Sequence, residues 1–156
     1  AMILDLRNNP GGIIDECVKV AGHLVPAGPV VSVVNRAGKK QTSYSALQAT
    51  KYPLVVLVNG GSASAAEIVA GAVQDTGVGT LVGTTTFGKG SVQSLVGLGD
   101  DTAIKLTTAK YLTPKDRPIT TDGIEPDIIV ELPADVREAG GDPQMDKAKE
   151  IIKTKM

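Results

Sequence analysis

Short apolar runs alternate with segments of helical periodicity along most of the chain. The run Leu54–Val58 is apolar at every position, which is typical of a strand covered on both faces of a mostly parallel sheet. Further β-type runs at residues 2–6, 29–35 and 80–82 predict additional strands. This alternation of strands and helices indicates the α/β class with a mixed β-sheet.

Two segments carry apolar residues at helical spacing. Residues 13–25 present one apolar face, whereas residues 64–74 are apolar around nearly the whole circumference, so the second helix is expected to be buried. Glycine-rich turns at residues 8–12 and 59–61 precede these helices and complete two strand-turn-helix units. Asp142 and Pro143 form an N-cap and first-turn proline for a last helix to about residue 153.

The remaining segments are rich in β-forming residues or in turn residues. A turn at residues 36–40 predicts a hairpin whose second arm starts near Gln41, and residues 43–51 are expected to be loop. Residues 91–98 and 102–112 predict another hairpin, although the first arm is equally compatible with a short helix. A last strand is expected over residues 127–130.

Composition excludes several classes of protein. With 16 Lys and Arg against 17 Asp and Glu there is no basic excess for nucleic-acid binding, and aromatic residues make up only 3%. No apolar stretch approaches the roughly 20 residues that a membrane span requires. One cysteine, Cys17, excludes an internal disulfide and a multi-cysteine metal site. The chain starts directly in a predicted strand without a leader, so we expect it to be a piece of a longer protein.

Ser64 lies where the buried helix is predicted to begin. Ser64 and Glu67 have the spacing of a capping box, in which the two side chains bind free amides at the helix start. The same free amides and the positive helix end can also stabilise an oxyanion, with Ser64 as the nucleophile. Ser62 is the rival nucleophile.

A second polar segment, residues 83–90, nearly matches the phosphate-binding pattern G-x-x-x-x-G-K-[ST]. Its last position is Gly90, so the magnesium-binding hydroxyl is missing, and no clear helix follows. Nucleotide binding is therefore the weaker interpretation, and Lys89 is either a solvated loop lysine or a general base. Free lysine has a pKa of roughly 10.4, so a lysine base has to be buried.

A serine nucleophile needs a base, and the chain offers two candidates. His23 is the single histidine and lies in the first predicted helix, where a surface or core role is favoured over a Ser-His-Asp triad. Lys89 would instead form a Ser-Lys dyad, taking the serine proton and returning it to the leaving amine.

Four segments together resemble the carboxyl-terminal processing, or tail-specific, proteases. They are L-D-L-R-N-N-P-G-G at residues 4–12, S-A-S-A-A-E-I at residues 62–68, F-G-K-G-S-V-Q at residues 87–93 and G-I-E-P-D at residues 123–127. Each alone is a weak signal, but they occur in the order of the family and span most of residues 2–132. The resemblance implies an α/β core of the ClpP/crotonase type.

The resemblance also implies roles for individual residues. Ser64 matches the nucleophile, Lys89 the general base and Gln93 the residue that orients the lysine. The amide of Ala65 and one amide of the turn Gly11-Gly12 match the oxyanion hole, and which glycine donates is left open. No cofactor and no metal are implied.

The implied protein is a serine endopeptidase that cuts proteins near accessible C-termini in an extracytoplasmic bacterial setting. We expect residues 1–133 to form the catalytic core and residues 134–156 a helical extension packed on it. The family normally carries a PDZ domain that captures the substrate, and none is found in these residues. A non-hydrolytic binding or scaffold domain of the same fold is therefore the alternative.

Overall fold

Two four-stranded sheets, with two helices between them, form the body of the protein. The computed structural model describes residues 1–48 and 52–156. The first sheet is parallel, in the order β1 (Met2–Asp5), β4 (Leu54–Val58), β5 (Gly79–Gly83), β8 (Ile128–Ile129). The second is antiparallel, in the order β3 (Lys40–Ser45), β2 (Gly28–Asn35), β7 (Thr102–Leu112), β6 (Ser91–Gly99).

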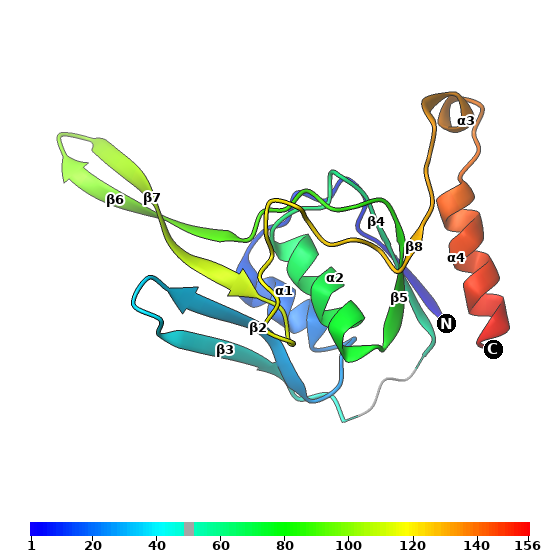
Figure 1. The fold of residues 1–156 in the computed structure, drawn as a ribbon, viewed down its shortest axis with the longest axis horizontal. Helices are drawn as coiled ribbons and strands as arrows, with labels where there is room; N and C mark the ends of the chain where they lie inside the picture. Colours follow the sequence, from blue (N-terminus) through cyan, green and yellow to red (C-terminus); the bar gives the residue numbers. More distant parts are fainter. Residues whose placement is uncertain (49–51) are drawn as a thin grey trace.

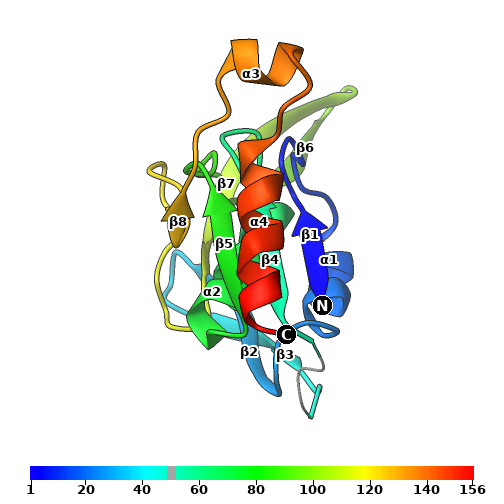
Figure 2. The same ribbon diagram turned by 90° about the vertical axis from the view of Figure 1, so that its right-hand side faces the viewer.

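The helices divide the space around the parallel sheet. Helices α1 (Ile14–Ala21) and α2 (Ala65–Thr76) lie between the two sheets, and α4 (Pro143–Thr154) covers the opposite face of the parallel sheet (Figures 1 and 2). The short helix α3 (Ala134–Glu138) precedes α4. The α/β class is confirmed, with parallel and antiparallel pairing in separate sheets. In the part of the chain that is described, no helix has the length and apolar character needed to cross a bilayer.

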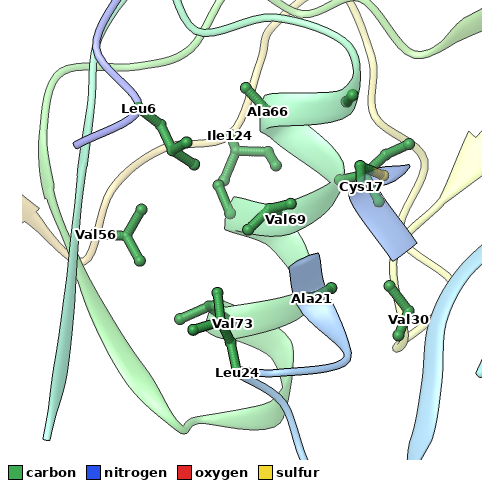
Figure 3. Close-up of a cluster of buried hydrophobic side chains, with 14 of the residues drawn as sticks. Leu6, Cys17, Ala21, Leu24, Val30, Val56, Ala66, Val69, Val73 and Ile124 are labelled. Atoms are coloured by element: carbon green, nitrogen blue, oxygen red, sulfur yellow. The ribbon is translucent and has the colours of Figure 1, made fainter. Parts of the chain in front are cut away.

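Strand β4 is buried on both faces, as its continuous apolar run predicts. Val56 and Val58 belong to the large core around α1 and α2, shown in part in Figure 3. Val55 and Leu57 point the other way and join a smaller core with Ala148 and Ile152 of α4. The strand therefore has no solvent-facing side.

The observed elements differ from the predicted ones at a few places. Helix α1 ends at Ala21, four residues before the predicted end, because Leu24 and Val25 remain buried after the helix stops and extend the apolar pattern. Residues 43–45 continue β3 instead of forming a loop, while residues 49–51 lie outside the described residues. The first arm of the second hairpin is a strand, not a helix. Helix α3 buries no residue and left no apolar pattern to detect.

A charged cluster holds the start of α4 against the end of β1. The Arg7 guanidinium donates to the carboxylates of Asp5 at 2.7 Å and Asp142 at 2.8 Å, and to the Gln144 side chain at 2.9 Å. Asp142 also accepts the amide of Met145 at 2.9 Å and so caps α4. This cluster joins the two ends of the chain across the edge of the parallel sheet.

We predict that the cluster makes the fold sensitive to acid. Hydrogen bonds from Arg7 hold the pKa of Asp5 and of Asp142 below the ordinary aspartate value. Because both groups are more acidic in the folded chain, the cluster stabilises the fold above about pH 3.9, and this contribution is lost as the pH falls through the lowered values. The thermal midpoint, followed by circular dichroism between about pH 5 and pH 2.5, should fall more steeply for the wild type than for Arg7→Gln. Parallel curves would contradict this prediction.

Candidate active site

Three turns meet at one edge of the parallel sheet. They follow β1, β4 and β5, whose carboxyl ends all lie at that edge, where α/β sheets commonly bind ligands. The amide of Ala63 donates to the carbonyl of Asn9 at 2.9 Å, and the amide of Phe87 donates to the carbonyl of Ser62 at 2.9 Å. The turn after β4 is therefore hydrogen-bonded to both of its neighbours.

Ser64 is the last residue of the turn after β4, and its backbone conformation is rare for residues other than glycine. Its φ is 55° and its ψ is −116°, immediately before the first residue of α2. Such conformations cost about 1–3 kcal/mol and gather at functional sites, where the surrounding contacts hold them in place. The residue is partly exposed, so its hydroxyl is within reach of a ligand.

Ser62, the rival nucleophile, is occupied by structural hydrogen bonds. It is fully buried, and its hydroxyl donates to the carbonyl of Leu6 at 2.7 Å. The same oxygen accepts the amide of Asn59 at 3.0 Å. Ser62 therefore fixes the turn after β4 to the end of β1, which leaves Ser64 as the accessible serine of the pair.

The turn Gly11-Gly12 lies directly against the Ser64 turn. A Cβ added at Gly11 would lie 2.6 Å from the carbonyl oxygen of Ala63 and 2.7 Å from the amide nitrogen of Ala65, and φ at Gly11 is +93°. The amide of Gly11 donates to the Asn9 side chain at 2.9 Å. Within residues 1–48 and 52–156, the amides of Gly12 and Ala65 have no hydrogen-bond acceptor. Gly12 is thus the glycine whose amide is free.

Glu67 connects the serine turn to the lysine loop. Its carboxylate is fully buried and accepts the amide of Ser64 at 2.9 Å, which is the glutamate half of the expected capping box. It also accepts the amides of Gly88 at 2.7 Å and Lys89 at 2.8 Å, and the hydroxyl of Thr86. The spacing of Ser64 and Glu67 predicts the first of these contacts, whereas no local pattern in the sequence predicts the contacts with residues 86–89.

The side chain of Lys89 is not buried, contrary to the requirement set out for a lysine base. Lys89 and Gln93 are both exposed, Gln93 on the edge strand β6. No hydrogen bond joins the side chains of Ser64, Lys89 and Gln93 in the described part of the chain. The fold thus fixes the backbone of Lys89 beside Ser64 and leaves its ammonium group in water.

Close backbone contacts explain the glycines around Lys89. A Cβ at Gly90 would lie 1.6 Å from the carbonyl oxygen of Ile119, and a Cβ at Gly88 would lie 2.6 Å from backbone atoms of residues 120–121. The segment of residues 117–121 is linked to α2, because the Asp75 carboxylate accepts a hydrogen bond from Nε of Arg117 at 2.9 Å. Because strand β6 follows the loop in place of a helix, the phosphate-loop interpretation is wrong.

The remaining candidates lie away from this edge. His23 is exposed and follows the far end of α1, opposite the turn Gly11-Gly12. Cys17 is buried in α1, as expected. This burial, and to a smaller extent the negative charge of the nearby Asp15, raises the pKa of its thiol to about 11. No three His, Cys, Asp or Glu side chains among the described residues are grouped as a metal site would require.

Comparisons with known proteins agree on one family. The model of peptidase family S41 matches residues 1–130. A carboxy-terminal-processing protease of Bartonella bacilliformis is 45% identical over 146 residues, which cover 90% of this chain and 33% of that protein. A carboxyl-terminal-processing protease of Synechocystis sp. is 50% identical over 132 residues, covering 84% and 31%.

A solved structure of a related protease has a similar fold. The photosystem II D1 C-terminal processing protease has a TM-score of 0.77 at 39% identity, over 86% of this chain and 36% of that one. The expected core of the ClpP/crotonase type is confirmed. The chain spans about a third of the length of the relatives it matches.

We predict that Gly11 and Gly12 differ sharply in their tolerance of a methyl group. Gly11→Ala should lower the free energy of unfolding by about 1–3 kcal/mol or more, because it combines backbone strain with contact against residues 63–65. Gly12→Ala is the matched control, since its Cβ meets nothing within 4 Å. Urea denaturation of both variants checks the prediction, and equal stability of the two would contradict it.

Proposed function

Because the chain belongs to peptidase family S41, we propose that it carries the reactive centre of a serine endopeptidase that cuts proteins near their C-termini. The observation that carries this proposal is the strained Ser64 at the start of α2, next to the free amides of Ala65 and Gly12. A serine held in this way presents its hydroxyl beside donors that are already in place for a developing negative charge.

In the proposed reaction, the Ser64 hydroxyl attacks the carbonyl carbon of the scissile peptide bond. The Nζ of Lys89, as a neutral amine, takes the hydroxyl proton, and the carbonyl oxygen becomes an oxyanion near the amides of Ala65 and Gly12. The C–N bond then breaks, the leaving amine takes the proton from Lys89, and an acyl-enzyme remains on Ser64. Water, activated by the same amine, hydrolyses this ester and restores the free serine.

Gly12 is the better candidate for the second oxyanion donor. The Gly11 amide already donates to Asn9, whereas the amides of Gly12 and Ala65 lack acceptors among the residues described. Gly11 instead brings the turn close enough to the Ala65 amide, because any side chain there would collide with residues 63–65. One glycine thus supplies the close approach and the other the donor.

The side chain of Lys89 has to be shielded from water before it can act as a base. The residue is exposed, whereas a lysine base has to be removed from water. A substrate segment lying over the loop would remove this water and favour the neutral amine. Gln93, four residues further along, is proposed to orient the amine once it is covered.

The substrates and setting follow the same line of argument. We propose proteins or peptides with accessible C-termini as substrates, in agreement with the names of the relatives. We also propose an extracytoplasmic location, as the resemblance to the family implies. Residues 1–133 would form the catalytic core and residues 134–156 the extension that covers the parallel sheet. The contacts of α4 with β1, β4 and β5 support the packing of this extension on the core.

A binding or scaffold role is the second candidate. The exposed Lys89, without a hydrogen bond to Ser64 in the described residues, favours a domain that keeps the fold without hydrolysis. The two candidates differ in what they predict for cleavage by the chain and its variants.

We expect cleavage to depend on both members of the dyad. Mass spectrometry of an unstructured protein incubated with the chain should show fragments cut near the C-terminus, and Ser64→Ala and Lys89→Ala should each lower the rate by at least about a thousandfold. Lys105→Ala, an exposed lysine on β7, is the matched control and should cleave normally. Unchanged cleavage by Ser64→Ala would exclude Ser64 as the nucleophile. No cleavage by any form would favour the scaffold role for these residues.

A further inference from the structure

The buried carboxylate of Glu67 makes more contacts than a helix cap requires. A capping-box residue needs one acceptor for the amide at the start of the helix, and glutamine serves there as well as glutamate. Here both oxygens accept two hydrogen bonds each: Oε2 from the amides of Ser64 and Lys89, and Oε1 from the amide of Gly88 and the hydroxyl of Thr86. Three of the four donors come from the loop after β5.

All four partners act as donors, so the site is built for an anion. The Thr86 hydroxyl accepts the amide of Ile124 at 2.8 Å, which leaves its own proton for Glu67. Glu67 has no cationic side chain beside it among the described residues, and its charge is balanced by amide dipoles and by the positive end of α2. A buried charge satisfied in this way is costly to lose, because each donor would be left without an acceptor.

We propose that Glu67 is a positioning residue, whose ionised carboxylate holds the turn of Ser64 and the loop of Lys89 in one fixed arrangement. This inference rests on the proposed Ser-Lys reaction. The amides of the two reactive residues share a single oxygen atom, at 2.9 and 2.8 Å, so neither backbone can move without disturbing the other. The same bond helps to retain the strained φ of Ser64.

Glu67→Gln separates this role from simple capping. Each carboxylate oxygen receives one backbone amide of the loop, Gly88 on Oε1 and Lys89 on Oε2. Whichever way the glutamine amide is turned, its NH2 group therefore opposes one of these two N–H donors. A cap-only role predicts that glutamine is tolerated, whereas the positioning role predicts that the loop is released.

The first experiment measures amide hydrogen exchange by NMR in the wild type and in Glu67→Gln. We expect the amides of Gly88 and Lys89 to exchange at least about tenfold faster in the variant, as hydrogen bonds that open locally do. Val73→Ala, at the other end of α2, is the control for a general loss of stability. It should leave the relative exchange rates of the loop unchanged. Protection of both loop amides in Glu67→Gln would overturn the proposal.

The second experiment follows peptide cleavage by the same variants. Glu67→Gln should lower kcat by about a hundredfold with little change in KM, since a small displacement of the reacting groups costs that much. Val73→Ala should retain kcat below its own melting temperature. If Glu67→Gln releases the loop yet keeps kcat, the positioning role is wrong. If the wild type cleaves nothing, the proposed function fails for these residues, while the exchange rates still decide whether Glu67 fixes the loop.

Discussion

The parallel sheet has no solvent-facing side at its centre, and this constraint organises the rest of the molecule. Val56 and Val58 pack toward α2 while Val55 and Leu57 pack toward α4, so β4 cannot slip by one residue without exchanging the two cores. A fixed register for β4 fixes where β1 and β5 end beside it. The three turns that carry the candidate reactive groups therefore meet because the strands below them cannot shift.

Hydrogen bonds between the three turns fix their positions relative to one another. Ser62 uses its buried hydroxyl to tie the turn after β4 to the end of β1, and Glu67 ties the same turn to the loop after β5. Gly11 allows the third turn to approach within contact of the Ala65 amide. The strained Ser64 lies at the junction of these contacts, which is how its unfavourable conformation persists.

Local patterns in the sequence predict some of these features, and contacts between distant segments account for those they miss. The apolar run of β4 and the spacing of Ser64 and Glu67 are local, so strand burial and the helix start could be predicted from them. The second set of donors to Glu67 comes from a loop about twenty residues away, whose path no local pattern specifies. The exposure of Lys89 was left open for the same reason, since glycine-flanked loops carry no periodicity from which burial can be inferred.

The fold constrains the two proposed reactive residues, Ser64 and Lys89, to different extents. At Ser64 the backbone and the neighbouring amides are set by contacts within the chain, whereas at Lys89 the contacts end at the backbone amide and the side chain is left in water. Desolvation of an amine requires another group to cover it. Lys89 lies exposed in the loop after β5, just before the edge strand β6. In the proposed reaction the substrate chain itself completes the site. Under that proposal, activation of Ser64 is coupled to occupancy of the site, because a bound peptide is what excludes water from Lys89.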